Sequence, residues 1–363
     1  MITRRKFIGT TALAAGAFAV VPSGFKNKNP SVNQFEGGEK KNPNSKFGGV
    51  QIGTITYSWR DLPCSAADII KYCQDSGVSS VELMGDVIET YAGLPPGLDD
   101  LPNPLSPEAQ ARLDGITKQY KMTVDQFRKM LKPTPSTWKM FVDGIVGSTE
   151  EQKKWRQTVP MTKFEELRKM FNDAGVEIHV AKLSPSSWSD GEIDYAFKVA
   201  KTLGAKGITD EAGIEAAKRL GPFAEKHGMF AIFHNHFQYA DKNFSADLIL
   251  AASPANMLNL DCGHYFGSTG LNPVDFIKKY HNRIISLHLK DKTGPNTNPP
   301  NANQVWGQGQ VPFEEILLLL KEHAHDKDWP KYGDIELEYT VAAWSNPVKE
   351  VKICVAYARQ ILI

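Results

Sequence analysis

The sequence has 363 residues, and its 42 Lys and Arg residues nearly balance 41 Asp and Glu residues, for a formal net charge of +1. Because no long run of one charge occurs, nucleic acid and anionic membrane surfaces are poor candidates as partners. The cysteines lack the CxxC spacing of a zinc ribbon, so we expect small buried thiols, although one pair could oxidise in an exported protein: Cys64, Cys73, Cys262 and Cys354.

The first residues have the pattern of an export signal. Arg4-Arg5 stands ahead of the apolar run 8–21, and Ala17-Phe18-Ala19 suits a cleavage site. The run is shorter than the about 20 apolar residues that a membrane span needs. We therefore predict a twin-arginine signal peptide over residues 1–22 and a periplasmic location, with an uncleaved anchor or an incidentally basic N-terminus as alternatives. Residues 23–49, rich in Asn, Lys, Gly, Ser and Pro, are predicted to be a flexible linker.

From residue 50 onward, strand-like and helix-like segments alternate. Eight apolar runs are strand candidates, and they cover residues 50–57, 79–83, 176–183, 206–209, 229–236, 257–261, 283–290 and 334–339. Eight parallel strands with intervening helices close as a TIM barrel, the (β/α)8 fold, which commonly has about 250 residues. We predict one such domain over residues 50–363. A doubly wound open sheet is the competitor, but no Gly-rich phosphate turn follows the first strand.

Residues 86–148 break the alternation, because they are Pro-rich, only partly helical and too long for a simple connection. We predict an insertion after the second strand that folds over the mouth of the barrel. Its Trp138 suits a lid or an inter-subunit contact, and a peripheral decoration without a catalytic role is the alternative. The alternation resumes with a predicted helix over residues 149–174.

Polar residues gather at the C-terminal ends of the predicted strands, where TIM barrels carry their chemistry. In strand order they are Glu82, His179 and Lys182, the segment Thr209-Asp210-Glu211, His234 and His236, Asp261 and His264, Ser286 with His288 and Lys290, and Glu336 with Glu338. Four consecutive strands thus supply His, Asp, His and Glu at one end of the barrel. Imidazole and carboxylate donors without a thiolate favour a divalent ion such as Mn²⁺, Co²⁺, Zn²⁺ or Mg²⁺.

Five segments carry a family resemblance: FHNHFQY, LDCGHYFG, ISLHLKDK, WGQGQVPFEEIL and IELEY. In order and spacing they resemble the xylose isomerase-like TIM barrels of the sugar phosphate isomerase/epimerase group, from about Val50 to the C-terminus apart from the insertion. The resemblance implies one divalent metal ion that binds sugar oxygens. Carried over position by position, its ligands are His234, Asp261, His288 and Glu338.

Two positions depart from the pattern of that family. His234 stands where many epimerases have a glutamate that is both a metal ligand and an acid/base group, which puts the two-carboxylate proton shuttle of those enzymes in doubt. Gly307-Gln308-Gly309 stands where Gly-Glu-Gly is frequent.

The chemistry that such a site supports is removal of a proton next to a carbonyl, through a metal-stabilised enediolate. We predict His236 or Glu338 as the base. Lys290 and His264 are expected to grip substrate oxygens or protonate a leaving oxygen, with an ion pair to Asp291 or another carboxylate as the alternative for Lys290. Weaker candidates for substrate contacts are Glu82, His179, Lys182 and a sugar-stacking Trp306, with Trp138 as a second stacking candidate.

Several functions remain open at this point. We expect a small-molecule sugar or glycoside as partner, in a reaction of the sugar isomerase/epimerase type. A lyase that cleaves a 3-keto-glycoside by β-elimination is the alternative, and a non-catalytic sugar-binding barrel is a further one. The metal-dependent AP endonuclease branch of the fold is disfavoured, because the chain lacks a basic DNA track. Export disfavours sugar phosphates, which are held in the cytoplasm. A homo-oligomer stays open.

Overall fold

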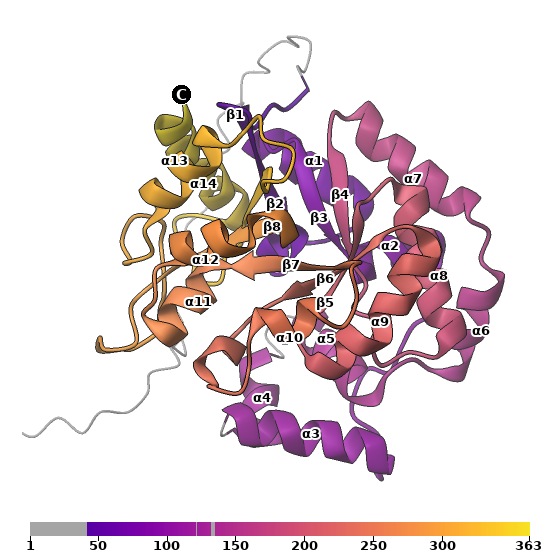
Figure 1. The fold of residues 1–363 in the computed structure, drawn as a ribbon. Helices are drawn as coiled ribbons and strands as arrows, with labels where there is room; N and C mark the ends of the chain where they lie inside the picture. The colour runs from indigo at the N-terminus through magenta and orange to yellow at the C-terminus, as the bar shows by residue number, and fades with distance from the viewer. Residues whose placement is uncertain (1–41, 121, 132–134) are drawn as a thin grey trace, which may run out of the picture. The chain divides into compact units, whose positions relative to one another are not determined.

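The computed structural model describes residues 42–120, 122–131 and 135–363, so the predicted signal peptide and the linker up to residue 41 lie outside the described residues. The strands follow the order β1-β2-β11-β8-β7-β6-β5-β4-β3, and a further pairing of β2 with β3 closes the sheet (Figure 1). The eight parallel strands are β2 (Val50–Ile55), β3 (Ser80–Met84), β4 (Glu177–Lys182), β5 (Gly207–Glu211), β6 (Phe230–His234), β7 (Asn256–Asp261), β8 (Ile284–Leu289) and β11 (Tyr332–Ile335). The predicted TIM barrel is confirmed.

Helices connect successive strands and surround the sheet (Figure 1). Those that alternate with the strands are α1 (Ala66–Ser76), α7 (Thr162–Asp173), α8 (Asp190–Leu203), α9 (Ile214–His227), α10 (Ala246–Leu250), α11 (Cys262–Thr269), α12 (Pro273–Tyr280), α13 (Phe313–Glu322) and α14 (Pro347–Leu362). Local sequence sets their ends. Before α1, the Ser65 hydroxyl accepts the Asp68 N–H and the Asp68 carboxylate accepts the Ser65 N–H, and Gly77 ends the helix at φ +82°.

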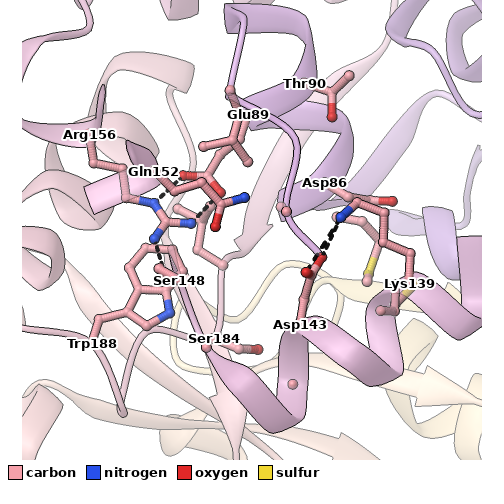
Figure 2. A pocket seen from close by; sticks show the side chains of 18 of the residues that line it. Asp86, Glu89, Thr90, Lys139, Asp143, Ser148, Gln152, Arg156, Ser184 and Trp188 are labelled. Carbon is pink, nitrogen blue, oxygen red and sulfur yellow. Dashed lines mark hydrogen bonds and ion pairs between the residues drawn. The ribbon is translucent and has the colours of Figure 1, made fainter. Parts of the chain in front are cut away.

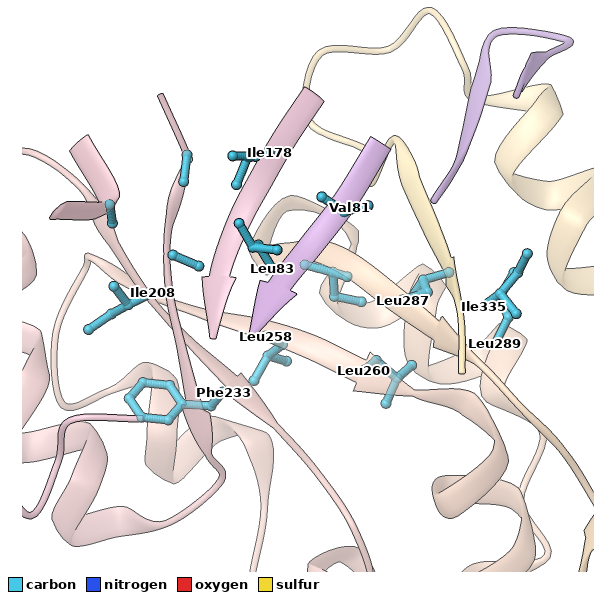
Figure 3. Close-up of a cluster of buried hydrophobic side chains, with 14 of the residues drawn as sticks. Val81, Leu83, Ile178, Ile208, Phe233, Leu258, Leu260, Leu287, Leu289 and Ile335 are labelled. Carbon is cyan, nitrogen blue, oxygen red and sulfur yellow. The ribbon is translucent and has the colours of Figure 1, made fainter. Parts of the chain in front are cut away.

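The main core lies between the outer face of the barrel and these helices. Alternate strand residues such as Leu83, Phe233 and Leu287 point outward and are fully or almost fully buried (Figure 3). A separate small cluster of Val180, Ile232 and Met257 is buried apart from them. Because strand side chains alternate between faces, the residues next to the outward ones point into the barrel. The polar residues therefore share the inner face.

The predicted insertion contains four helices, α2 (Gly85–Ala92), α3 (Pro107–Tyr120), α4 (Val124–Leu131) and α5 (Pro135–Val146). It has an apolar core of its own, in which Trp138 packs with Phe127 and Val142 and stacks on Phe141 at a ring distance of 5.3 Å. Trp138 is 4% exposed, so it supports the insertion and does not offer a free face for a sugar.

The predicted helix over residues 149–174 is wrong as a single helix. The structure has α6 (Glu150–Thr158) and then α7, and Val159 between them is extended. Pro160 explains the break, since it has no N–H to donate and restricts the residue before it to extended conformations.

The folded domain begins before Val50. The strand β1 (Lys46–Phe47) pairs antiparallel with β2, and the buried Ser45 hydroxyl donates to the Ile52 carbonyl at 2.5 Å. The last residues of the predicted linker therefore belong to the barrel. Two short strands, β9 (Asp291–Lys292) and β10 (Asn303–Gln304), form a separate ribbon. In the described part of the chain, no helix is long and apolar enough to cross a membrane. All four cysteines are free thiols.

Candidate active site

Four side chains from neighbouring strands meet at the C-terminal end of the barrel. His234 ends β6, Asp261 ends β7, His288 lies in β8, and Glu336 follows β11 directly. One donor atom from each lies within 4.8 Å of the others, and all four residues are buried. The Asn235 side chain also fixes the first two strand ends to each other: its Oδ1 accepts the Asp261 N–H at 2.9 Å, and its Nδ2 donates to the Asp261 carbonyl at 3.2 Å.

The carboxylate in this group is that of Glu336, and the structure places the predicted ligand Glu338 outside it. The reason is the length of the last strand. β11 ends at Ile335, so Glu336 occupies the strand end and Glu338 lies beyond it, 22% exposed. The other three predicted ligands, His234, Asp261 and His288, are brought together as expected.

His288 connects this group to the opposite side of the barrel. Its Nε2 lies 2.8 Å from Glu82 Oε2 on β3, and its Nδ1 lies 3.1 Å from Glu336 Oε2. Burial alone would lower the pKa of His288, but the two carboxylates raise it well above the ordinary histidine value. Glu82 also accepts from the Asn259 amide at 2.8 Å. Glu82, predicted to touch substrate, therefore supports His288 from within the barrel.

The pKa of His234 is shifted in the opposite direction to that of His288. Burial, together with the charges of His288 and His236, lowers the pKa of His234 well below the ordinary value. Its Nδ1 is buried and has no hydrogen-bond partner among the described residues. A neutral imidazole with an unpaired nitrogen is a competent metal ligand. The donor set of two imidazoles and two carboxylates therefore fits a divalent ion.

Lys290 is the internal cation of this site. Its Nζ lies 3.0 Å from Asp261 Oδ2 and 2.8 Å from one oxygen each of Glu336 and Glu338. Burial opposes charge on the amine, but these carboxylates raise the pKa of Lys290 well above the ordinary lysine value. Burial raises the pKa of Asp261 to about 6 even though Lys290 opposes the shift. A divalent ion and the Lys290 ammonium would therefore compete for the carboxylate oxygens of Asp261 and Glu336.

The mouth above this group carries two more histidines. His264 follows Asp261, whose Oδ1 accepts the His264 N–H at 2.6 Å and so starts α11. Lys290 Nζ lies 2.8 Å from His264 Nε2, and burial together with Lys290 lowers the pKa of His264 well below the ordinary value. The His236 ring stacks on His264 at 4.8 Å, and its Nε2 lies 3.3 Å from Glu211 Oε2. His236 is the more accessible of the two, with 31% of its side chain exposed.

Two predicted substrate contacts have other roles in the structure. His179 is fully buried, with its nitrogens 2.9 Å from Ser80 Oγ and 2.9 Å from Asp334 Oδ2, and its ring stacks on Tyr332. Tyr332 starts β11, so His179 lies deeper in the barrel than the site. Trp306 is 6% exposed and packs on Phe313 at 4.6 Å. Both side chains are therefore engaged by contacts within the protein, whereas Lys182 does reach the mouth and pairs with Glu211 at 2.7 Å.

The Gly307-Gln308-Gly309 segment folds around Asp291. The buried Asp291 carboxylate accepts the N–H groups of Gly307 and Gly309, each at 2.8 Å, as well as those of Lys292 and Val311. A Cβ at position 309 would collide with this carboxylate, which explains the second glycine. The Asp291 carboxylate is thus occupied by backbone N–H groups. Lys290 pairs instead with the carboxylates of the site, which belong to Asp261, Glu336 and Glu338.

Comparison with known proteins begins with sequence. No family model matches the chain. An inosose dehydratase from Clostridium botulinum (strain Alaska E43 / Type E3) is 30% identical over 125 residues, which cover 30% of this chain and 41% of that protein. An inosose dehydratase from Clostridium perfringens (strain 13 / Type A) is 26% identical over 151 residues, or 49% of its length. The chain thus spans less than half the length of these curated relatives.

Solved structures match over a much larger part of the chain. A sugar phosphate isomerase/epimerase from Parabacteroides distasonis has a TM-score of 0.50 at 17% identity, covering 87% of this chain and 96% of that one. A xylose isomerase domain protein from Alicyclobacillus acidocaldarius has a TM-score of 0.51 at 10% identity, with 86% and 98% covered. The chain has the xylose isomerase-like barrel fold. A probable 3-DHS dehydratase from Bacillus anthracis shares it, with a TM-score of 0.51 at 16% identity and 84% and 98% covered.

Within this xylose isomerase-like barrel, three residues contribute to the site although the sequence pattern assigned them no role: Glu211 and Glu336, which were among the polar strand ends, and Asn259. Glu211 was visible at the end of the fourth strand, and its contact with His236 depends on how far β5 extends. Glu336 shares a strand face with Glu338, and only the end of β11 distinguishes them. Asn259 lies two residues before Asp261 on the inward face, so the period of two was the signal that could have found it.

Proposed function

We propose that this chain is a divalent-metal-dependent enzyme that removes a proton next to the carbonyl group of a sugar or a sugar-like ketone. The observation that carries the proposal is the buried group of His234, Asp261, His288 and Glu336 with His236 directly above it. A metal-type donor set and an accessible base in one barrel mouth are the parts that such a reaction needs. The names of the curated relatives, both dehydratases, support chemistry on a ketone-bearing ring.

The residues divide the work as follows. When bound between the four donors, a divalent ion supplies positive charge that polarises the carbonyl. His236 is the base, because it is partly exposed and has Glu211 at 3.3 Å to hold its ring in place. The Lys290 ammonium holds the carboxylate of Glu338 at 2.8 Å, so this pair offers a proton on the β11 side of the mouth.

We favour β-elimination as the outcome of the reaction. After His236 takes the proton from the carbon next to the ketone, the bond between the next carbon and its oxygen breaks. The electron pair leaves with that oxygen, which takes a proton from the Lys290 side. The balance needs no oxidant or reductant. A dehydratase or a lyase follows this sequence, and the relatives named dehydratases support it.

Isomerisation or epimerisation is the second candidate, because the first step is the same. Glu338 is partly exposed and lies with Lys290, whereas Glu211 lies with His236. Carboxylates near both sides of the mouth could return the proton to a different face or carbon. A non-catalytic sugar-binding barrel would bind metal and sugar without exchange of any proton.

Incubation with ketoses and with 3-keto-glucosides in deuterated water tests the proposal. Elimination is supported by loss of water, or by release of the group that is attached through the glycosidic oxygen. In either case the proton on the carbon next to the ketone must be lost to the solvent. Deuterium in a rearranged but intact sugar supports the isomerase. Stoichiometric metal without exchange on any of these ketones would remove both and leave the binding barrel.

We also propose that the protein is exported, since the twin-arginine pattern lies ahead of the barrel. Fractionation of cells that make the full chain tests this, with Arg4→Lys, Arg5→Lys as the variant. The proposal predicts that the wild type reaches the periplasm and that the double variant stays in the cytoplasm.

A further inference from the structure

A cavity of about 720 Å³ lies between the insertion and the barrel mouth. Its walls come from α2, α5 and α6 and from the segments that follow β3 and β4. Figure 2 shows Arg156, Glu89 and Trp188 on one side of it and the Lys139–Asp143 pair on the other. The volume is within the about 300–1,000 Å³ of small-molecule sites. The proposed reaction at the barrel mouth does not itself require this cavity.

The cavity and the active site share a wall. Lys182 and Glu211 line the cavity and pair at 2.7 Å. The other oxygen of Glu211 lies 3.3 Å from His236 Nε2. A ligand that fills the cavity therefore ends within reach of the base.

The charges in the cavity disfavour an anionic ligand. Its three cations already have carboxylate partners: Arg156 pairs with Glu89 at 2.7 Å and Glu192 at 2.9 Å, Lys139 with Asp143 at 3.4 Å, and Lys182 with Glu211 at 2.7 Å. Asp86 adds a carboxyl, and desolvation by the surrounding walls raises its pKa. A phosphate would face these acids without an unpaired cation on the described walls. Hydroxyl groups, which both donate and accept, match such a lining.

The cavity also has an apolar side. Trp188 lines it, with the Arg156 guanidinium 3.8 Å from the ring centre, and Met84, Leu94 and Met140 lie on its walls. Sugar rings combine hydroxyl edges with C–H faces, and aromatic and apolar side chains suit those faces. Paired charges and apolar surface together describe an uncharged polyol.

We propose that this cavity holds the second unit of a two-part, uncharged substrate, so that the substrate is a glycoside and not a free ketose or a sugar phosphate. The inference rests on the proposed function, which places the ketone-bearing ring at the His234 group. In elimination, the bond to the second unit breaks, its electron pair leaves with the glycosidic oxygen, and that oxygen takes a proton. The second unit then leaves as a neutral alcohol from the cavity.

Gly144 allows a direct test. It lines the cavity on α5, and a Cβ at this position meets nothing within 4 Å, so the backbone accepts a side chain there and Gly144→Phe adds bulk to the cavity wall. Gly115→Phe is the matched control, because Gly115 lies in helix α3 of the same insertion, is equally open, and does not line the cavity.

Two measurements keep the inference separate from the proposed reaction. The first is calorimetric binding of glucose, maltose, cellobiose and trehalose, none of which carries the ring ketone. We expect at least one disaccharide to bind the wild type about tenfold or more tightly than glucose, and this preference to vanish in Gly144→Phe and persist in Gly115→Phe. Equal binding of glucose and all disaccharides, or a preference that survives Gly144→Phe, overturns the inference.

The second measurement is kcat/KM on two 3-keto-glucosides, one with a methyl group and one with glucose as the second unit. Gly144→Phe should lower kcat/KM for the glucose-bearing substrate, relative to kcat/KM for the methyl substrate, about tenfold or more. Gly115→Phe should leave this ratio of kcat/KM values unchanged. An unchanged ratio in Gly144→Phe counts against the cavity. Absence of turnover on both substrates in every protein counts against the proposed reaction alone, and the binding measurement then decides on the cavity.

Discussion

The barrel mouth and the insertion cavity both contain buried charges, but they arrange them differently. At the mouth, Lys290 shares its ammonium among three carboxylates, and one oxygen of Glu336 serves both Lys290 and His288. In the cavity, Arg156 is held by Glu89 through two bonds of 2.7 and 2.9 Å. Shared partners can be exchanged when an ion or a substrate enters, whereas a bidentate pair keeps its geometry. The contrast indicates a group of exchangeable ion pairs beside a rigid wall.

The largest expected effect is at His288, which lies between Glu82 and Glu336 and belongs to the four-residue donor group at the barrel mouth. We expect His288→Gln to reduce bound metal to less than about a tenth of an equivalent, because the metal group loses an imidazole donor. Elemental analysis of the purified protein measures this. His227→Gln on α9, which alters a partly buried pair with Asp194, is the control and should keep its metal. Full metal content in His288→Gln would disprove the ligand assignment.

His236 tests the division of labour within the mouth. We expect His236→Ala to lower kcat by about 10²–10⁴-fold while bound metal stays unchanged, because a base is lost and the four donors are not. The exchange of the substrate proton with deuterated solvent should fall in parallel. His281→Ala, at a ring stacked on Trp329, should change neither quantity. Exchange at the wild-type rate in His236→Ala would rule this residue out as the base.

Arg156 tests whether the cavity wall is as rigid as its bidentate pair indicates. Its side chain is 5% exposed, and Arg156→Met would leave Glu89 and Glu192 buried without their partner. We expect the free energy of unfolding to fall by about 3–5 kcal/mol in a urea titration. Arg219→Met breaks an ion pair with Asp190 that is largely exposed, and should cost no more than about 1 kcal/mol. Equal losses in the two variants would contradict the contrast between wall and surface.

The smallest effect concerns the pH dependence of stability. Because the folded chain holds the pKa of His264 well below 6.5, the unfolded chain binds a proton there first, and stability falls as pH falls below about 6.5. In metal-free protein we expect the free energy of unfolding to fall by about 1 kcal/mol more in the wild type than in His264→Gln between pH 6.5 and 5.5. Asp261 acts in the opposite direction below its pKa of about 6, but it is present in both proteins. Urea titrations between pH 6.5 and 5.5 with chelator measure the slopes, and identical slopes would contradict a neutral His264.

The sequence was sufficient to predict the barrel and three of the four donor residues at its mouth. Period two places His234, Asp261 and His288 on inward faces, and parallel strands bring their ends together. The same period cannot give depth along the barrel axis, which is why His179 was expected at the mouth although it lies near Tyr332 at the start of β11. It also cannot choose between Glu336 and Glu338, because that choice depends on where β11 ends.

The insertion was recognised by its length, but its packing against the rest of the domain was beyond local patterns. Arg156 lies in a segment with helical periodicity, and nothing in that pattern shows that its partners are Glu89 and Glu192, 67 and 36 residues away in sequence. The cavity follows from this long-range packing. Trp306 is a similar case, because its burial depends on how the loop after β8 folds.

The carboxylate of Asp291 has a consequence for the loop that carries Gly307 and Gly309. By composition, an exposed loop with two glycines is a segment whose amide hydrogens would exchange rapidly with solvent. Here the amides of Gly307, Gly309 and Val311 are all bonded to one buried acid. Their exchange requires the three bonds to open together, so these amides should exchange as a cooperative unit and far more slowly than their place in a loop would indicate.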